Sequence, residues 1–193
     1  NGQHYWELGK RDYSVNSLLW KKQLFILYQL INSVKNIEGD IAEVGVYKGG
    51  SAKLISRFKG NKTLYLFDTF QGHPETQAID HKSGYKKGQY NYSLHNVTKY
   101  LKNEKNVIFY KGIFPETVKN INNHFSFVHL DIDLYKSTKN ALEFFYPKMS
   151  VGGIILSHDY SVEGIRNAFD EFFEDKKEVP FLISGNQIMM VKL

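Results

Sequence analysis

Short runs of hydrophobic residues alternate with amphipathic segments along most of the chain. The hydrophobic runs have the length and composition of strands buried on both faces: 41–44, 63–68, 107–111, 125–131 and 153–158. Between them, apolar residues recur every three or four positions, as on one face of a helix, at 51–58, 91–103, 115–121, 137–146 and 164–173. Strands that alternate with helices are typical of a parallel sheet with helices on both faces. The pattern predicts an α/β fold with a doubly wound, Rossmann-like sheet.

Both ends of the chain add to this scheme. Apolar residues recur at helical spacing over 17–34, which predicts a helix with Ser17 as its N-cap, within an N-terminal helical extension over 1–38. At the other end, 180–184 and 187–192 flank a Gly185-Asn186 turn, a pattern typical of a β-hairpin. We therefore expect a sheet of about seven strands in which the last strand is antiparallel.

The composition narrows the classes of protein that remain. The length of 193 residues fits one compact domain, so we expect a single domain over 1–193. The absence of cysteine excludes disulfides, cysteine-ligated zinc, iron–sulfur clusters and a thiol nucleophile. The net charge of +5 comes from scattered lysines, which argues against a nucleic-acid partner. Because no signal segment follows the first residue and no apolar run approaches the roughly 18 residues of a membrane span, we expect a cytoplasmic protein without a membrane partner.

The connection over 70–92 is too long to serve only as a link between a strand and a helix. It contains His73, His81, Tyr85 and Tyr90. Loops of this length inside a compact domain are usually functional. We expect it to form a lid over the carboxyl edge of the sheet, where open α/β folds bind their ligands.

A glycine-rich turn follows the first predicted strand, with the sequence EVGVYKGGS from Glu43 to Ser51. Glycines permit positive φ angles and let a ligand approach the backbone closely. Asp68 ends the next strand, where a carboxylate binds ribose hydroxyls in Rossmann-like sheets. Together these features predict a nucleoside-containing ligand. The turn lacks the GxGxxG spacing of dinucleotide-binding dehydrogenases, so a nicotinamide-linked dehydrogenase is the least favoured hypothesis. The structural alternative is a plain glycine turn followed by a helix-capping aspartate.

Two later strands end in residues that could bind a metal. Asp131 ends one of them, and His158 with Asp159 ends the next. Carboxylate oxygens with one imidazole suit magnesium, manganese or another divalent ion. Neighbouring residues on an extended strand point to opposite faces, so His158 and Asp159 can both ligate only if the chain has begun to turn. The alternative is that Asp133 or Asp159 caps the following helix and His158 is a polar residue near the core.

Five blocks of sequence resemble the macrocin O-methyltransferase (TylF-type) family. In the family's order they are EVGVYKGG from Glu43, DTFQGHP from Asp68, LDIDLYKST from Leu130, YPKMSVGG from Tyr146, and DY from Asp159 followed by GIRNAF. They span about 41–173, most of the chain. The resemblance implies a class I methyltransferase fold, S-adenosylmethionine as methyl donor, and a divalent metal, usually magnesium, that binds vicinal hydroxyls of a sugar or related acceptor.

The resemblance also implies a role for each matching position. The residues that match the donor loop are Glu43, Gly45, Tyr47, Gly49, Gly50 and Ser51. Those that match the contacts to the ribose are Asp68, Thr69 and Phe70, and those that match the contacts to the adenine are Gly112 and Ile113. Asp131 and Asp159 match metal ligands, and Asp131 would lie close enough to the acceptor to act as the base. His158 is a departure, because the better-known antibiotic-tailoring members carry aspartate there. An imidazole can still ligate a metal, but one negative charge is lost.

The expected reaction is an in-line displacement in which an acceptor oxygen attacks the sulfonium methyl and S-adenosylhomocysteine leaves. The acceptor would be a small molecule or glycan, and Asp131 would take the proton of its hydroxyl. Two alternatives stay open: a non-catalytic module that binds S-adenosylmethionine as a sensor or with a partner protein, and an RNA methyltransferase. The apolar first helix, with Trp20, Phe25 and Tyr28, could form either a homo-oligomer interface or part of the core.

Overall fold

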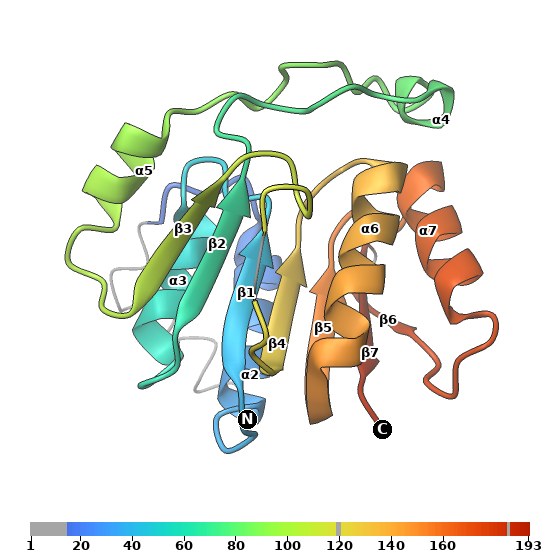
Figure 1. Cartoon of the computed structure of the whole chain (residues 1–193). Helices are drawn as coiled ribbons and strands as arrows, with labels where there is room; N and C mark the ends of the chain where they lie inside the picture. Colours follow the sequence, from blue (N-terminus) through green and yellow to red (C-terminus); the bar gives the residue numbers. More distant parts are fainter. Residues whose placement is uncertain (1–14, 119–120, 185) are drawn as a thin grey trace.

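The computed structural model describes residues 15–118, 121–184 and 186–193. It contains a seven-stranded sheet in the order β3-β2-β1-β4-β5-β7-β6 (Figure 1). The strands are β1 (Asp40–Val44), β2 (Leu64–Asp68), β3 (Val107–Lys111), β4 (Phe125–Leu130), β5 (Met149–Ser157), β6 (Phe181–Ser184) and β7 (Gln187–Val191). The first five strands pair in parallel, whereas β7 pairs antiparallel with β5 and β6. The expected doubly wound sheet with an antiparallel last strand is confirmed.

Helices cover both faces of this sheet. They are α2 (Lys21–Ser33), α3 (Gly50–Phe58), α4 (Ala78–His81), α5 (Leu94–Tyr100), α6 (Tyr135–Phe145), the 3-10 helix η1 (Tyr146–Lys148) and α7 (Glu163–Phe173). Figure 1 shows α2 and α3 on one face and α6 and α7 on the other. Successive residues of a strand point to opposite faces, so Phe127 packs on the α2 and α3 side while Val128 packs under α6 and α7. Phe125 lies on the same side as Val128 because the pairing of β4 with β5 is irregular between Phe125 and Phe127.

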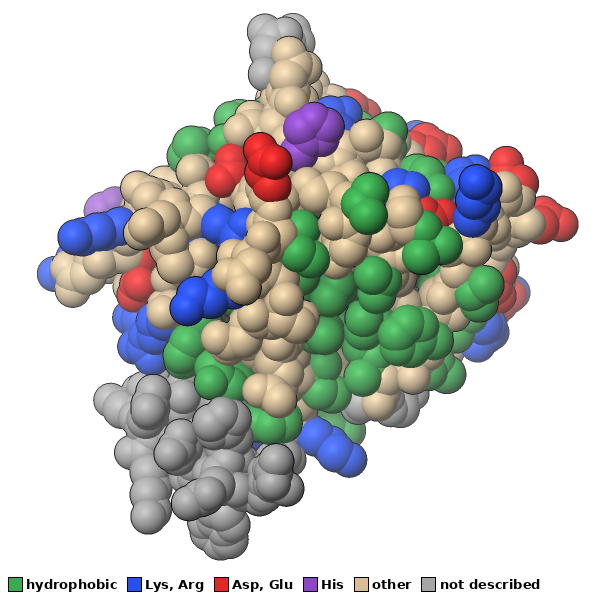
Figure 2. Space-filling model, turned by 90° about the horizontal axis from the view of Figure 1, so that it is seen from below, with side chains coloured by type: hydrophobic (Ala, Val, Ile, Leu, Met, Phe, Trp, Pro, Cys, Tyr) green, Lys and Arg blue, Asp and Glu red, His purple; other side chains and the backbone are tan. Residues whose placement is uncertain are grey.

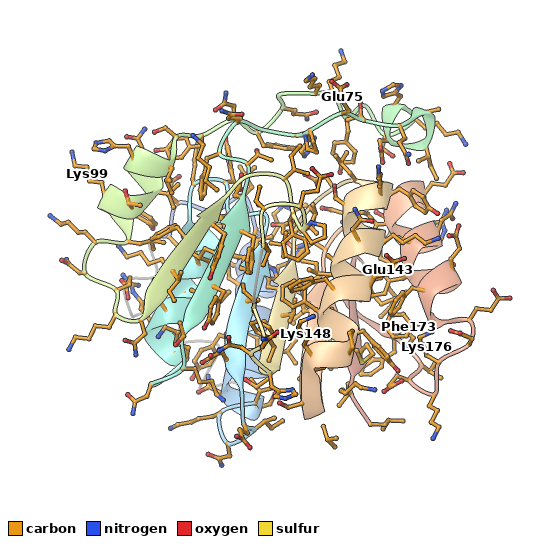
Figure 3. All side chains as sticks on the ribbon, in the orientation of Figure 1. Glu75, Lys99, Glu143, Lys148, Phe173 and Lys176 are labelled. Carbon is orange, nitrogen blue, oxygen red and sulfur yellow. The ribbon has the colours of Figure 1, made fainter. Side chains whose placement is uncertain are left out.

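The residues outside these two layers are mainly polar. Figure 3 shows Glu75 and Lys99 at the edge of the molecule and Glu143 on α6, all three exposed, whereas Phe173 packs into the layer formed by α6 and α7. Seen from below in Figure 2, hydrophobic side chains also gather on the surface at the amino ends of the parallel strands. Such a surface is compatible with a homo-oligomer, which stays a prediction. No helix in the described ranges has the length and hydrophobicity needed for a membrane span.

Some expectations about local structure are wrong. The first described helix begins at Lys21 with Trp20 as its N-cap, and the Ser17 hydroxyl instead accepts a hydrogen bond from the Leu19 N–H. The helix expected over 115–121 does not form in the described part of that range: 115–117 are turns, and 118 and 121 have no regular structure. Phe114 and Ile121 are both buried in the core, and the backbone between them closes only local hydrogen bonds such as Thr117 N–H to the Ile113 oxygen. Residues 119–120 lie outside the described residues. The expectation for 1–14 lies outside the described residues.

The order of the strands locates the place where a ligand can bind. Chain connections run in opposite directions from β1 and β4, which are neighbours in the middle of the sheet. In open α/β sheets, ligands bind at the carboxyl ends of the strands at such a switch point. Residues 70–92, which include α4, cross above this edge in Figure 1.

Candidate functional site

The turn between β1 and α3 comes very close to the end of β4. Gly45 has a φ of +88°, and a Cβ atom built on it would lie 1.9 Å from the backbone oxygen of Asp131. Only glycine tolerates both this backbone conformation and this approach. Tyr47 and Gly49 also have positive φ angles, and α3 begins at Gly50. The glycine-rich sequence therefore folds into a tight loop against the strand that precedes Asp131.

Asp68, at the end of β2, holds this loop in place. Its Oδ2 accepts hydrogen bonds from the backbone N–H groups of Val46 at 2.8 Å and Tyr47 at 2.9 Å. Its Oδ1 accepts a hydrogen bond from the N–H of Phe70 at 2.7 Å. One carboxylate thus connects the turn after β1 with the turn after β2, and it forms part of the wall of the cavity between them.

A cavity of about 370 Å³ opens at the carboxyl edge of the sheet, next to these two turns. Most of the site residues expected from sequence line it: Gly45, Tyr47, Gly50, Ser51, Asp68, Thr69, Gly112, Ile113, Asp131, His158 and Asp159. The expected contacts Glu43, Gly49 and Phe70 are not in its wall. The connection over 70–92 contributes His73, Tyr85 and Tyr90 to the same wall.

Glu43 lies behind the cavity, within the sheet. Its side chain is fully buried, and Oε1 lies 2.8 Å from Nδ1 of His129 on the neighbouring strand. The His129 ring in turn contacts the ring of His158 edge to face, with 4.9 Å between centroids. The structure therefore places Glu43 in a buried polar pair and not, as the resemblance implied, in the donor loop.

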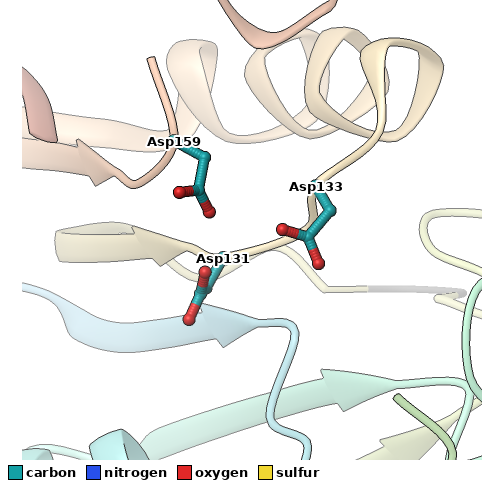
Figure 4. A group of neighbouring side chains, drawn as sticks. All are labelled: Asp131, Asp133 and Asp159. Carbon is teal, nitrogen blue, oxygen red and sulfur yellow. The ribbon is translucent and has the colours of Figure 1, made fainter. Parts of the chain in front are cut away.

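Three aspartates meet at the floor of the cavity. Asp131 follows β4, Asp159 follows β5, and Asp133 lies in the turn before α6. One carboxylate oxygen from each lies within 4.8 Å of those of the other two (Figure 4). Asp133 and Asp159 both have positive φ angles, 66° and 59°, so the chain turns sharply at each. These turns bring side chains from two adjacent strands to one point.

The close approach of these carboxylates disfavours their ionisation. Burial raises the pKa of Asp131 well above its usual range, and the charges of Asp133, Asp159 and Glu43 raise it further. Burial and the charge of Asp133 raise the pKa of Asp159 to about 6, although a hydrogen bond from the Asn186 amide opposes this shift. Within the described part of the chain, no lysine or arginine forms an ion pair with Asp131 or Asp159. The cluster thus favours a cation or bound protons.

The composition of this cluster differs from the set expected for a metal. His158 is buried beside it, and its Nε2 lies 3.2 Å from the Gln187 amide nitrogen, which can donate to a neutral ring. Burial, together with His129, lowers the pKa of His158 well below 6.5. The structure therefore brings Asp131 and Asp159 together but leaves His158 outside the cluster and adds Asp133. The signal for Asp133 in the sequence is the Asp131-Ile132-Asp133 run directly after a buried strand, which places a second carboxylate at the ligand-binding edge of the sheet.

Comparison with known proteins gives consistent matches. Residues 14–183 match the family model described as macrocin-O-methyltransferase (TylF). The chain is 28% identical over 152 residues to 8-demethyl-8-(2,3-dimethoxy-alpha-L-rhamnosyl)-tetracenomycin-C 4'-O-methyltransferase of Streptomyces olivaceus, a match that covers 70% of this chain and 58% of that protein. It is 28% identical over 188 residues to demethyldecarbamoylnovobiocin O-methyltransferase of Streptomyces niveus, covering 84% of this chain and 70% of that protein.

Solved structures resemble the fold over most of its length. The O-methyltransferase NovP superposes with a TM-score of 0.82 at 25% identity, over 91% of this chain and 81% of that one. The calicheamicin methyltransferase CalS11 superposes with a TM-score of 0.75 at 21% identity, over 88% of this chain and 78% of that one, and supports the fold alone. The described strands and helices are thus those of a class I, Rossmann-like methyltransferase.

Proposed function

Because the chain belongs to the macrocin O-methyltransferase (TylF) family, we propose that it transfers a methyl group from S-adenosylmethionine to a hydroxyl of a sugar or glycosylated small molecule. One observation carries this proposal: the glycine loop held by Asp68 and the cluster of three aspartates open into the same cavity. A donor and a hydroxyl acceptor bound there would lie next to each other. By their descriptions, both named relatives from Streptomyces are O-methyltransferases, and the one from Streptomyces olivaceus acts on a rhamnosyl-tetracenomycin.

The donor would bind along the loop and the two turns beside it. In this proposal, the Asp68 carboxylate accepts hydrogen bonds from the ribose hydroxyls, as carboxylates at this position do in Rossmann-like sheets. Thr69 lies beside it in the cavity wall, and Gly112 and Ile113 offer the surface for the adenine. Ile113 is 44% exposed, so an apolar face is available for a flat base. The turn from Gly45 to Ser51 would receive the methionine end.

A divalent cation fits the acidic cluster. Magnesium and manganese prefer carboxylate oxygens, and Asp131, Asp133 and Asp159 supply three of them within reach of one ion. When bound, such an ion lowers the pKa of a hydroxyl that coordinates it. His158 would support the site from outside, through the buried contacts that orient the end of β5.

The proposed catalytic residue is Asp131. Its carboxylate belongs to the acidic cluster and lies in the wall of the cavity that the donor loop also lines, so an acceptor hydroxyl bound there would be next to it. Asp131 would take the proton of the acceptor hydroxyl as the oxygen forms a bond to the methyl carbon. The bond from that carbon to sulfur breaks in the same step, and S-adenosylhomocysteine leaves. The remaining task of the protein is to hold the two reactants in line.

The first test is calorimetric titration of the protein with S-adenosylhomocysteine. We expect binding by the wild type, weakened at least about tenfold, or 1.4 kcal/mol, in Asp68→Ala. Asp175→Ala, at an exposed residue just after α7 that pairs with the adjacent Lys176, is the matched control and should bind like the wild type. A folded wild-type protein that does not bind S-adenosylhomocysteine would overturn the proposal.

The second test is methyl transfer to a panel of glycosides, with magnesium or with a chelator. We expect turnover that needs the cation and that Asp131→Asn abolishes while its affinity for S-adenosylhomocysteine stays close to that of the wild type. Normal turnover by Asp131→Asn would exclude its role as the base. Binding of the donor product without turnover on any acceptor would instead favour a non-catalytic, S-adenosylmethionine-binding module. Strong, salt-dependent RNA binding would favour an RNA methyltransferase.

A further inference from the structure

The segment 70–92, which we call the lid, has its own internal structure. His73 and its partners on the returning arm hold the two arms together: the His73 N–H donates to the Gln89 oxygen at 2.8 Å, and the Gly88 N–H donates to the His73 oxygen at 2.9 Å. The His73 ring contacts the rings of Tyr85 and Tyr90, with centroids 5.4 and 5.3 Å apart. The lid is therefore a folded element and not a loose loop.

The lid touches the acidic cluster through a side chain. Nε2 of His73 lies 3.0 Å from Oδ2 of Asp133, and the two side chains are only 9% and 15% exposed. The Tyr85 ring packs beside this pair, and the charge of Asp133 contributes to the raised pKa of the Tyr85 hydroxyl after burial itself. Of the three clustered carboxylates, Asp133 is the one with a histidine partner in the described structure.

A second connection lies two residues further along the chain. The side chain of Asp80, in α4 of the lid, is almost completely buried. Its Oδ1 accepts a hydrogen bond at 2.9 Å from the N–H of Tyr135, the first residue of α6, and its Oδ2 accepts one at 2.8 Å from the N–H of Gln77. The lid thus contacts the segment before α6 at two points, through His73 at Asp133 and through Asp80 at Tyr135.

The backbone at Asp133 needs such support. The N–H of Leu134 donates to the oxygen of Ile132 at 2.8 Å, which closes a three-residue turn around Asp133 with φ at 66°. Turns of this kind with positive φ are rare and strained. A strained residue keeps its conformation only where its surroundings determine it. At Asp133 the surroundings on the cavity side are His73 and the rest of the lid.

We infer that His73 and Asp80 are positioning residues through which the lid holds Asp133 in the acidic cluster and completes a cation site. The inference rests on the proposed function, because it assigns the cluster to a divalent ion. It also has a thermodynamic consequence. If the closed lid strengthens cation binding, then the bound cation must stabilise the closed lid by the same free energy.

The test is Mn²⁺ titration, followed by electron paramagnetic resonance, on the full chain saturated with S-adenosylhomocysteine. His73→Phe keeps an aromatic ring against Tyr85 and Tyr90 but removes the nitrogen that contacts Asp133. We expect it to weaken Mn²⁺ binding about 10- to 100-fold, the usual effect of losing a partner of a metal ligand. His73→Gln, whose amide nitrogen reaches about as far as Nε2, should recover most of the affinity. His81→Phe is the matched control, because His81 is an exposed lid residue that contacts Thr76 and not the cluster.

The outcomes separate this inference from the proposed function. A wild type that binds S-adenosylhomocysteine but not Mn²⁺ overturns the cation site and this inference with it. A wild type that binds Mn²⁺, with His73→Phe binding it equally well, overturns this inference alone. An unchanged affinity of His73→Phe for S-adenosylhomocysteine shows that the variant is folded and that any loss is confined to the cluster.

A second measurement needs no variant. Trypsin can cut the lid after Lys86 and Lys87, which are exposed, and can cut after the exposed Lys177 far from it in sequence. Saturating Mn²⁺ should slow cleavage after Lys86 and Lys87 severalfold and leave cleavage after Lys177 unchanged. Equal lid cleavage rates with and without Mn²⁺ would overturn the inference even if His73→Phe does not fold.

Discussion

The carboxylate of Glu43 lies 2.8 Å from Nδ1 of His129, and both side chains are completely inaccessible to solvent. The two residues stand opposite each other on the parallel strands β1 and β4. The remaining polar atoms, Oε2 of Glu43 and Nε2 of His129, have no hydrogen-bond partner. The pair therefore depends on its one hydrogen bond, because a buried polar group without a partner costs free energy.

Glu43→Ala should therefore destabilise the fold without removing the donor site. We expect a loss of about 1–3 kcal/mol in the free energy of unfolding, the usual effect of leaving one buried partner unsatisfied. Urea unfolding measures this loss, and Glu143→Ala, on the exposed face of α6, is the control. If Glu43→Ala instead keeps its stability and loses affinity for S-adenosylhomocysteine, the side chain contacts the donor as the resemblance implied.

The closeness of Gly45 to Asp131 predicts a second effect on stability. Gly45→Ala places a Cβ atom against the backbone oxygen of Asp131, and neither backbone can move without disturbing β4 or the donor loop. Gly60→Ala is the matched control, because Gly60 has a similar positive φ of 65° but nothing within 4 Å of the added atom. The control should cost about 1–2 kcal/mol from backbone strain. Gly45→Ala should cost at least about 1–3 kcal/mol more from overpacking.

Chemical unfolding of the two glycine variants measures this difference. Equal losses for Gly45→Ala and Gly60→Ala would mean that the donor loop does not pack on the end of β4 as described. A Gly45→Ala chain that fails to fold, beside a folded Gly60→Ala chain, agrees with the prediction.

Glu178 gives a prediction for the pH dependence of stability. Burial opposes ionisation of this carboxyl, but hydrogen bonds from Lys192 and Tyr146 outweigh it and lower the pKa to about 2, from 4.5 in an unperturbed glutamate. A carboxyl whose pKa is lower in the folded state stabilises the fold above its unfolded pKa. That stabilisation is lost as the pH falls from about 4.5 towards 2.

Glu178→Gln should therefore be less stable than the wild type at pH 7, and the difference should shrink at pH 3. Urea midpoints at several pH values measure it. Glu174→Gln, an exposed residue of the same segment, should follow the wild type throughout. A stability difference for Glu178→Gln that stays constant down to pH 3 would contradict the ionised, hydrogen-bonded state of Glu178.

The sequence predicts the parts of this molecule that depend on local pattern. Continuous apolar runs identify β1, β2, β4 and the second half of β5 because a strand covered on both faces has no polar side to interrupt the run. The edge strand β3 also has an apolar run, although Ile108 stays exposed there. Asp68 is predictable for a similar reason, since a carboxylate at the end of β2 must lie at the ligand-binding edge. A residue at the end of a predicted strand can thus be placed at this edge of the sheet from the local sequence alone.

The missed features depend on which way the chain turns. Asp133 joins the cluster because the backbone adopts a positive φ there, and His158 leaves it because its ring packs on His129 and Gln187. The sequence predicts Glu43 as a ligand contact, but its side chain pairs with His129, which is 86 residues away in the sequence. Local periodicity describes neither sharp turns nor pairings between distant strands, so these features require the three-dimensional structure.

The acidic cluster predicts opposite effects for a bound cation and for a lost carboxylate. Three carboxylate oxygens within 4.8 Å repel one another, so a divalent cation should stabilise the protein. Magnesium at about 100 times its dissociation constant adds about 2.7 kcal/mol, which for a chain of this size raises the melting temperature by roughly 5–10 °C. Asp159→Asn removes one of the repelling charges and one ligand. The metal-free variant should therefore melt above the metal-free wild type and gain little from magnesium.

Thermal melts with magnesium and with a chelator test both effects. Glu143→Gln removes one negative charge from an exposed site and should behave like the wild type, which separates a specific site from general screening by the salt. Sodium chloride at matched ionic strength extends the same control, because sodium screens charge without a preference for a cluster of carboxylates. If magnesium raises the melting temperature of Asp159→Asn as much as that of the wild type, the cation binds elsewhere, because a site that loses one of three carboxylate ligands cannot keep its full affinity.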